Sequence, residues 1–506
     1  MEKKYIFLVC SCVASFCLAG CNSDLDDYKA GSSSGTDVEV SEASEDDYVE
    51  NSTFTQVVYI HFSGSSASVV NEVSGVSVSQ SGAAVIVSST VKEVEYILSG
   101  TTTEGSFKLY SDYKCKLSLN GVDITSVSGP AINIQSGKRI FVVLEEGSDN
   151  YLTDSSSYPS SSEDQKAAFF SEGQLLFSGS GSLTVKGNYK HAICSDDYIF
   201  IREGVRIAVT GTVKDGFHCN DYFLMEGGTL DICSSDEGIC CEEGSVVIHD
   251  GDITIETNGT SAKGIKGVGN VTINGGEIRI TASGKGSCEG IESKNILTIN
   301  GGLIEVNAYD DGLNASKAIN INGGTIYSYS TNNDGIDSNG TLSISGGLVI
   351  ACGTTQPEDG IDCDNNTFAI TGGTVLGVGG GSSTPTSSVC TQPSVIYGGS
   401  GSSGDLFHIA ADDGTGILTF RLPRSYSQMT VLYSGPALKT NQSYTICSGG
   451  TSAGGTDYYG YITDNTYSGG TTLYTFTVAS MVTQVGSSSG SGGSNPGGSG
   501  RPGGGW

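Results

Sequence analysis

The chain contains few basic residues. Lysine and arginine together number 25 among 506 residues, against 55 aspartates and glutamates, and the formal net charge is −30. Binding to nucleic acids needs clustered Lys and Arg side chains that contact phosphates, so this composition argues against that class of function. We expect the partners to be cations, neutral ligands, or ligands bridged by cations.

Proline is also scarce, with 9 residues, whereas glycine reaches 74. No segment shows an amphipathic pattern of helical length. Frequent glycines between short apolar alternations are typical of many short strands joined by tight turns. The sequence therefore predicts an all-β protein.

Long hydrophobic runs are missing as well. The apolar stretch at residues 6–16 follows Lys3 and Lys4 and ends at a Leu-Ala-Gly-Cys sequence, residues 18–21. It is far shorter than the roughly 18 residues needed to cross a bilayer. We interpret residues 1–20 as a signal peptide that directs export.

Cys21 follows small residues, as in the lipobox that is cleaved in bacterial lipoproteins, and is predicted to be the lipidated residue. The alternative is an ordinary secretory signal with a chance cysteine. The acidic residues 23–27 resemble a signal for display on the outer face of the outer membrane, although they also suit the start of an acidic linker. We expect a lipid-anchored protein of the outer membrane, exposed at the cell surface.

Internal repetition dominates the middle of the chain. A Gly-Gly or similar corner, with apolar alternation on both sides, recurs every 22 to 26 residues. The second glycine of each copy falls at Gly228, Gly251, Gly276, Gly302, Gly324, Gly347 and Gly373. This period is shorter than a propeller blade, and the copies lack the leucine and asparagine signature of leucine-rich repeats.

The alternation changes phase across each corner. Leu297 and Ile299 precede one Gly-Gly pair, and Ile304 and Val306 follow it. A chain that bends at the glycines keeps both sets of side chains pointing inward. The pattern predicts a right-handed parallel β-helix, a solenoid in which each coil pairs with its neighbours.

The extent of the repeat and the shifts in composition divide the chain into segments. We predict a Ser-rich acidic linker at 21–55, the β-helix at 56–380, a C-terminal β cap at 381–485 and a Gly/Ser/Pro tail at 486–506. The cap is expected because the open end of a solenoid must be covered.

A second motif, an acid followed by glycine and an apolar residue, recurs 12 or 13 residues before each corner. In-register stacking predicts one column with Glu289, Asp311, Asp334 and Asp359. A parallel column is predicted to contain Glu292, Asn314, Asp337 and Asp362.

Stacked carboxylates need a positive partner, because charges about 5 Å apart repel by about 1 kcal/mol even in water. Calcium accepts six to eight oxygen ligands in flexible geometry and is the predicted cofactor. The candidate ligands are Asp215, Asp236, Glu237, Glu289, Glu292, Asp310, Asp311, Asn314, Asp334, Asp337, Glu358, Asp359 and Asp362.

The competing interpretation is that acid-glycine pairs only form tight turns. Turn chemistry does not explain the additional acids around them. One coil departs from the pattern, because Lys263 and Lys266 occupy the acidic positions. These lysines either form internal ion pairs, which we favour, or mark a break between two acidic clusters.

The repeated acid-Gly-Ile and Asn-Gly-Gly units, with Leu119-Asn120-Gly121-Val122 and residues 179–188, resemble a known family over roughly residues 56–380. These are calcium-binding right-handed β-helix carbohydrate-binding domains, whose fold is similar to that of pectate lyases. The resemblance implies non-catalytic binding of plant cell-wall polysaccharide, pectin-like or glucan, with calcium at the acidic coils. The two lysines depart from the family pattern.

Two other functions stay open. A polysaccharide lyase acting on uronate polymers would use calcium and a base such as Lys266 or Lys294. A structural surface adhesin would use the metal for stability alone. No nucleophile motif is present and no catalytic residue is assigned, so we favour a protein that is not an enzyme.

The remaining reactive side chains give weaker signals. The five histidines, among them His191 and His218, show no metal-ligand spacing. Of 15 cysteines, 11 lie beyond Cys21, an odd number that argues against a fully paired disulfide framework. Cys219 and Cys241 occupy the same register one coil apart, and we favour buried thiols over a bond.

Tyrosines gather in two places, at residues 327 and 329 and at 458, 459 and 461. Tyrosine is common in strands, so we interpret these residues as ordinary strand residues, with stacking on sugar rings as the alternative.

Overall fold

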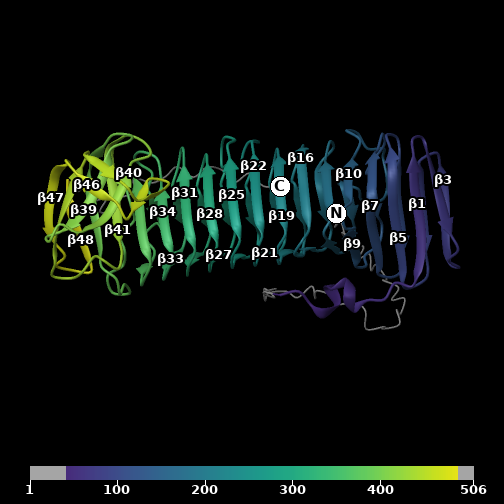
Figure 1. Cartoon of the computed structure of the whole chain (residues 1–506), viewed down its shortest axis with the longest axis horizontal. Helices are drawn as coiled ribbons and strands as arrows, with labels where there is room; N and C mark the ends of the chain where they lie inside the picture. Colours follow the sequence, from purple (N-terminus) through teal and green to yellow (C-terminus); the bar gives the residue numbers. More distant parts are fainter. Residues whose placement is uncertain (1–41, 488–506) are drawn as a thin grey trace, which may run out of the picture. The chain divides into compact units, whose positions relative to one another are not determined.

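The computed structural model describes residues 42–487, which form an all-β solenoid. The predicted signal peptide, Cys21, residues 22–41 and the tail from residue 488 lie outside the described residues. The strands of the solenoid stack side by side (Figure 1), and their pairings form three parallel ladders. The right-handed parallel β-helix predicted from the repeat is confirmed.

The ladders are formed by strands that recur once per coil. The first ladder contains β1 (Gln56–Ser63), β5 (Val94–Thr102), β7 (Cys115–Thr125), β9 (Ile140–Leu144), β12 (Leu175–Gly179), β15 (Ile199–Ile201), β18 (Tyr222–Met225), β21 (Ser245–Ile248), β24 (Val271–Ile273), β27 (Ile296–Ile299), β30 (Ala318–Ile321), β33 (Thr341–Ile344) and β36 (Phe368–Ile370). The second contains β10 (Asp149–Thr153), β13 (Ser182–Lys186), β16 (Arg206–Thr212), β19 (Thr229–Ser234), β22 (Asp252–Thr257), β25 (Glu277–Ala282), β28 (Leu303–Ala308), β31 (Thr325–Ser330), β34 (Leu348–Cys352) and β37 (Thr374–Gly379). The third contains β4 (Ala84–Ser89), β6 (Ser106–Ser111), β8 (Ile132–Ile134), β11 (Ala167–Ser171), β14 (His191–Ser195), β17 (Phe217–Cys219), β20 (Ile239–Cys241), β23 (Ile265–Gly267), β26 (Ile291–Ser293), β29 (Leu313–Ala315), β32 (Ile336–Ser338) and β35 (Ile361–Asp362).

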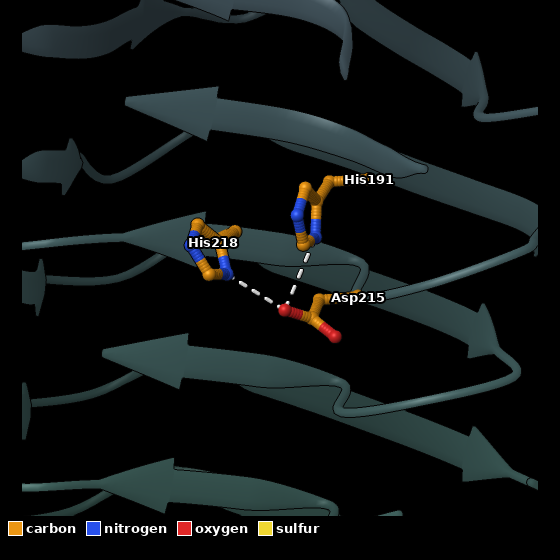
Figure 2. Close-up of side chains that lie close together, drawn as sticks. All are labelled: His191, Asp215 and His218. Atoms are coloured by element: carbon orange, nitrogen blue, oxygen red, sulfur yellow. Dashed lines mark hydrogen bonds and ion pairs between the residues drawn. The ribbon is translucent and has the colours of Figure 1, made fainter. Parts of the chain in front are cut away.

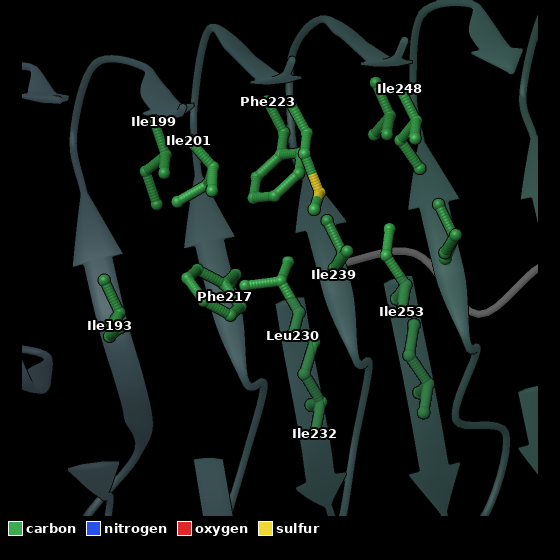
Figure 3. Close-up of a cluster of buried hydrophobic side chains, with 14 of the residues drawn as sticks. Ile193, Ile199, Ile201, Phe217, Phe223, Leu230, Ile232, Ile239, Ile248 and Ile253 are labelled. Carbon is green, nitrogen blue, oxygen red and sulfur yellow. The ribbon is translucent and has the colours of Figure 1, made fainter. Parts of the chain in front are cut away.

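The core lies inside the coils and consists of aligned aliphatic columns (Figure 3). Leu230 pairs with Ile253, which pairs with Ile278, and the column continues to Ile304. A second predicted column, from Met225 to Ile299, has the same one-coil register. All these side chains are buried, so the phase change at each corner does direct both strands inward.

The corner glycines adopt a left-handed backbone. Gly324, for example, has φ +90°, and a Cβ there would lie 2.9 Å from the carbonyl oxygen of Gly302 in the preceding coil. L residues with side chains are strained at such φ values. Glycine is therefore required where the first ladder turns into the second.

We expect Gly324→Ala to lower the free energy of unfolding by about 1–3 kcal/mol, from left-handed strain and contact with the preceding coil. Chemical denaturation followed by circular dichroism measures this change. Gly137→Ala is the matched control, because Gly137 has an ordinary φ and no atom near its missing Cβ. Equal effects of the two substitutions would contradict the assigned role of the corner.

The first coils are closed by antiparallel hairpins. β2 (Ser66–Asn71) pairs with β1, and β3 (Val76–Ser81) pairs with β4. Two short 3-10 helices, η1 (Glu45–Asp47) and η2 (Val49–Asn51), belong to a segment that packs against outward apolar residues of the first ladder. Part of the predicted linker thus covers the wall of the β-helix.

The C-terminal region continues the second ladder and then folds into further sheets. β37 pairs antiparallel with β41, which also pairs with β38. The strands of this region are β38 (Ser394–Gly401), β39 (Leu406–Ala411), β40 (Gly416–Arg421), β41 (Tyr426–Ser434), β42 (Ser443–Ser448), β43 (Thr451–Ala453), β44 (Thr456–Tyr458), β45 (Tyr461–Thr463), β46 (Thr466–Ser468), β47 (Thr471–Thr477) and β48 (Val482–Gly486). Across residues 42–487, no helix has the length and apolar character of a membrane span.

Candidate functional site

The acid-glycine motifs lie where the second ladder leads into the third. From Gly216 to Gly335, the backbone N–H of the motif glycine donates to the carbonyl oxygen of the corresponding acidic-position residue in the next coil, as from Gly312 to Asp334 at 3.1 Å. The predicted stacking of acids is therefore confirmed.

This stacking produces two columns of side chains, the first column and the second column. The first column contains Asp215, Glu237, Lys263, Glu289, Asp311, Asp334 and Asp359. The second column contains His218, Cys240, Lys266, Glu292, Asn314, Asp337 and Asp362.

The C-terminal half of the columns brings carboxylates together. Oxygen atoms of Glu289, Asp310 and Asp311 lie within 4.8 Å of one another, and so do those of Asp311, Asp334 and Asp337. Asp311 is shared by both groups, which makes them one continuous acidic cluster. It accepts hydrogen bonds from the Asn314 side chain at 3.0 Å and from the Asp334 backbone at 3.1 Å.

The cluster extends into the last coil. Asp359 donates its backbone N–H to Asp334, at 2.5 Å, and Asp362 accepts a hydrogen bond from the Ser383 hydroxyl at 2.6 Å. Burial, with the charges of Asp310 and Asp362, raises the pKa of Glu358. The predicted ligands from Glu289 to Asp362 therefore occupy neighbouring coils on one edge of the solenoid.

Burial and mutual repulsion disfavour the charged forms of these acids. Burial, with the nearby Asp311 and Asp359 carboxylates, raises the pKa of Asp334 to about 9. Burial and the Glu292 carboxylate raise the pKa of Glu289 to about 8. Burial and Asp362 raise the pKa of Asp359 to about 8. A bound cation is the partner that would restore the ionised forms near neutral pH.

Two oxygens in this region have no hydrogen-bond partner. They are Oε2 of Glu289 and Oε2 of Glu292, and both residues are over nine-tenths buried. Buried carboxylate oxygens without partners are costly and need an explanation such as an ion. An all-oxygen donor set from flexible turns fits calcium, the ion predicted from the sequence.

The two lysines of the departing coil form ion pairs with acids of the flanking coils. Lys263 Nζ lies 3.6 Å from Glu289 Oε1, and Lys266 Nζ lies 3.3 Å from Glu237 Oε1. The favoured interpretation of these lysines as ion-pair partners is confirmed. The ion pairs separate the C-terminal acidic cluster from the acids of the preceding coils.

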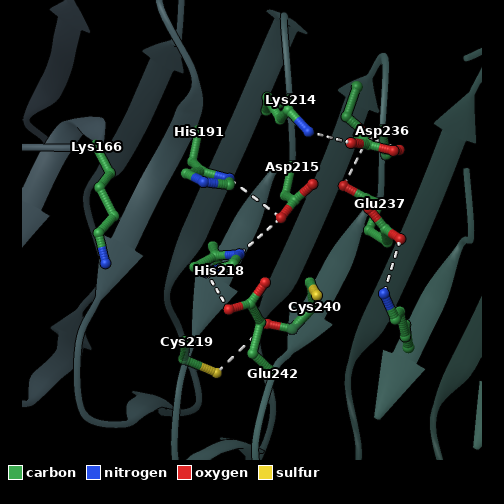
Figure 4. A network of polar contacts seen from close by, with 12 residues as sticks. Lys166, His191, Lys214, Asp215, His218, Cys219, Asp236, Glu237, Cys240 and Glu242 are labelled. Carbon is green, nitrogen blue, oxygen red and sulfur yellow. Dashed lines mark hydrogen bonds and ion pairs between the residues drawn. The ribbon is translucent and has the colours of Figure 1, made fainter. Parts of the chain in front are cut away.

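The N-terminal end of the columns has different partners (Figure 4). Asp236 forms an ion pair with Lys214 at 2.9 Å, and Asp215 contacts the imidazoles of His191 and His218. Asp215, Asp236 and Glu237 also have oxygens within 4.8 Å of one another. These three predicted ligands thus lie together, but each has a basic partner.

The contact of His191 and His218 with Asp215 was not predicted from the spacing of the histidines along the chain. They are 27 residues apart, about one coil, so their proximity appears only when coils are aligned. All eleven cysteines of the described region are free thiols, which includes the stacked pair Cys219 and Cys241. The favoured prediction of unbonded thiols agrees with this.

The tyrosines singled out from the sequence attach the C-terminal region to the coils. Tyr327 stacks on Tyr459 with ring centroids 4.1 Å apart, and Tyr459 Oη donates to Glu305 Oε2 at 2.7 Å. The guanidinium of Arg424 lies over the Tyr329 ring, 4.6 Å from its centroid. These contacts favour a structural role for Tyr327 and Tyr329.

Comparison with known proteins adds to this geometry. The profile of a family described as carbohydrate-binding domain-containing proteins matches residues 81–335, just over half of the chain. The chain belongs to this family. The match covers the third-ladder strands from β4 to β29 and most of both columns. The family assignment confirms the carbohydrate-binding part of the resemblance found in the repeats.

Two similar proteins illustrate the extent of the likeness. A carbohydrate-binding domain-containing protein of Acetivibrio thermocellus is 31% identical over 114 residues, which is 22% of this chain and 40% of that protein. The chain thus matches less than half of that relative's length. A solved structure, described as a polysaccharide lyase-like protein from C. thermocellum in a gadolinium derivative, is 27% identical with a TM-score of 0.43. It aligns with 48% of this chain and 96% of its own.

Proposed function

We propose that this protein binds polysaccharide at the bacterial surface in a calcium-dependent manner and without catalysis. The observation that carries the proposal is the cluster of stacked, buried carboxylates from Glu289 to Asp362. Membership of the carbohydrate-binding domain family supports the ligand class. The proposed cofactor is Ca²⁺, held by oxygens of neighbouring coils.

Calcium would be held chiefly by Glu289, Asp310, Asp311, Asp334 and Asp337. The close approach of their oxygens and the unpartnered Glu289 Oε2 support this assignment. Bound calcium supplies positive charge where the chain has a surplus of carboxylates. The carboxylates of these residues would hold the ion at the solenoid edge.

The net charge favours an acidic glycan bridged by metal. At −30, the protein repels a polyuronate unless cations lie between the two. Calcium bound at the columns would accept uronate carboxylates as further oxygen ligands. We therefore propose a pectin-like chain as the first ligand and a neutral glucan as the comparison.

Polysaccharide lyase activity is disfavoured by the state of the lysines. Burial lowers the pKa of Lys266, but Glu237 and Cys240 more than offset this, and the net pKa lies above the usual value. Lys294 forms an ion pair with Glu292. A lysine that acts as general base needs a lowered pKa, so Lys266 is not prepared for proton abstraction. The ion pair with Glu292 occupies the Lys294 ammonium.

The surface location is part of the proposal. The N-terminal signal pattern and Cys21 support a lipid anchor in the outer membrane, with the β-helix outside the cell. Metabolic labelling with a fatty acid, in the native chain and in Cys21→Ser, tests the anchor. Equal label in both would contradict it.

The function is tested by isothermal titration of polygalacturonate into the protein in calcium and in EDTA. We expect binding in calcium and a loss of at least about 100-fold in affinity in EDTA, since the bridging ion is removed. Neutral β-glucan is the control ligand, because it lacks the carboxylates that would bind calcium. Equal polygalacturonate affinity in both buffers would contradict the proposal.

Two further outcomes are informative. Calcium-dependent thermal stabilisation without binding of either glycan would indicate an adhesin in which the metal is structural, and would overturn the proposal. Release of unsaturated uronates, detected by ultraviolet absorbance, would establish a lyase and overturn it as well.

A further inference from the structure

Two histidines from neighbouring coils meet at the N-terminal end of the columns (Figure 2). His191 begins β14, and His218 is the middle residue of β17, the next strand of the third ladder. Their imidazole rings are stacked, with centroids 4.1 Å apart and an interplanar angle of 27°. Asp215 lies on the loop between β16 and β17, immediately before Gly216.

Both imidazoles are directed at one carboxylate oxygen. Asp215 Oδ2 lies 3.1 Å from His191 Nδ1 and 2.7 Å from His218 Nδ1. Each of the three residues is more than nine-tenths buried. The structure therefore gathers two ring nitrogens and one carboxylate oxygen in a site shielded from solvent.

The hydrogen bonding of this group is incomplete. The contact between His191 Nδ1 and Asp215 lacks hydrogen-bond geometry, and Nδ1 has no other partner. Oδ1 of Asp215 also has no hydrogen-bond partner and points away from both imidazoles (Figure 2). Buried polar atoms of this kind are expected to be satisfied, by an ion where protein partners are missing.

We propose that His191, Asp215 and His218 bind one zinc-like divalent metal ion, distinct from the calcium of the acidic cluster. Imidazole nitrogen is a preferred ligand of zinc, whereas calcium selects oxygen. Three protein ligands leave a fourth position for water. Tetrahedral ligands at about 2.0–2.1 Å from zinc lie about 3.3 Å apart, close to the 3.1 and 2.7 Å that separate Asp215 Oδ2 from the two imidazole nitrogens. The stacked rings would have to rotate so that the ion lies in the plane of each imidazole.

Glu242 supports this assignment from behind His218. Its Oε2 lies 3.7 Å from His218 Nε2, the ring nitrogen that does not face Asp215. A distance of 3.7 Å is too long for a hydrogen bond. Closer approach of this carboxylate to Nε2 in the metal-bound state would fix the tautomer in which Nδ1 is free to bind metal. The site would join two successive coils, so the same stacked edge would hold a nitrogen-bound ion at one end and oxygen-bound calcium at the other.

Zinc titration calorimetry on the full chain, produced without a histidine tag and with 1 mM calcium present, tests the site. We expect one zinc ion with Kd in the micromolar range or tighter, and no displacement by calcium. The double variant His191→Asn with His218→Asn should lose at least about 100-fold in affinity, and Glu242→Gln about 10-fold. His61→Asn is the control, because His61 is an exposed histidine on β1.

Free thiols make a second measurement necessary. The described region has eleven, so zinc binding that persists in the double variant would assign the ion to cysteine and overturn the proposal. If the double variant does not fold, X-ray absorption of the zinc-loaded native chain decides. Imidazole and oxygen scattering without sulfur supports the site, and sulfur ligation or no bound zinc contradicts it. This result is independent of any calcium or polysaccharide measurement.

Discussion

Asp311→Asn combined with Asp334→Asn is expected to weaken calcium binding by about 100-fold or more. Each tenfold loss of affinity corresponds to about 1.4 kcal/mol of binding free energy. Asp311 is the residue shared by both carboxylate groups, and Asp334 lies directly beside it in the next coil. Asparagine keeps the size and one oxygen of each side chain but removes the charge that attracts the ion. Calcium titration by calorimetry measures the loss.

The same double variant should be as stable as the native chain, or more stable, when calcium is absent. Its asparagines remove two buried carboxyls whose ionisation the fold disfavours. Asp231→Asn is the matched control, because Asp231 is an exposed acid on β19 away from the columns. Native calcium affinity in the double variant would remove Asp311 and Asp334 from the ligand set.

The second large effect is on the pH dependence of stability. Without calcium, we expect the unfolding temperature to fall by at least about 5 °C as the pH rises from 5 to 9. The cause is the set of raised pKa values in the acidic cluster, which burial increases to about 7 for Asp311, about 8 for Glu289 and about 9 for Asp334. Differential scanning calorimetry at several pH values measures the trend.

The direction follows from proton binding. Below the ordinary pKa of a carboxyl, the acids are protonated in both states and impose no penalty. Above it, the unfolded chain releases protons that the folded chain retains until about pH 7 to 9. Stability is therefore lost as the pH rises from the ordinary carboxyl pKa to the raised pKa of the folded state. His191 contributes in the opposite direction near its usual pKa, because burial lowers its pKa in the folded state.

Calcium should suppress this loss, since a bound cation favours the ionised carboxylates. Its affinity should correspondingly rise with pH, because the ligands must lose protons before they bind. The Asp311 and Asp334 double variant should show a shallower pH profile in EDTA. An unfolding temperature in EDTA that rises steadily from pH 5 to 9 would contradict the assigned pKa shifts.

Much of the fold follows from local patterns in the sequence. The corner glycines and the alternation of residues such as Ile299 and Ile304 specify where each coil bends and which side chains point inward. Because the repeat length is nearly constant, the same pattern also specifies the register that stacks Asp311 on Asp334. The acidic cluster was predictable for this reason.

Other features depend on long-range packing that the repeat does not encode. Phe200 points outward from β15 and is covered by Tyr48, whose ring lies 5.8 Å away and edge-on. Tyr327 is covered in a similar way by the C-terminal region. The available signal was the unbroken apolar run Ile199-Phe200-Ile201, which indicates a strand covered on both faces.

The histidine pair was missed because ligand spacing was sought along the chain. In a solenoid, the relevant alignment is by coil register, which places His191 beside Asp215, three residues before His218. The basic partners of Asp215 and Asp236 were missed for a similar reason, since Lys214 belongs to the coil before Asp236. Alignment of all side chains by coil is the analysis that would have found these contacts.

The central claim is that calcium held by the stacked carboxylates is what binds the polysaccharide. The most direct measurement is titration of polygalacturonate, in saturating calcium, into the native chain and into the folded Asp311→Asn, Asp334→Asn variant. We expect binding to the native chain and at least about a 100-fold loss of affinity in the variant. Equal affinity for the two proteins would contradict this claim.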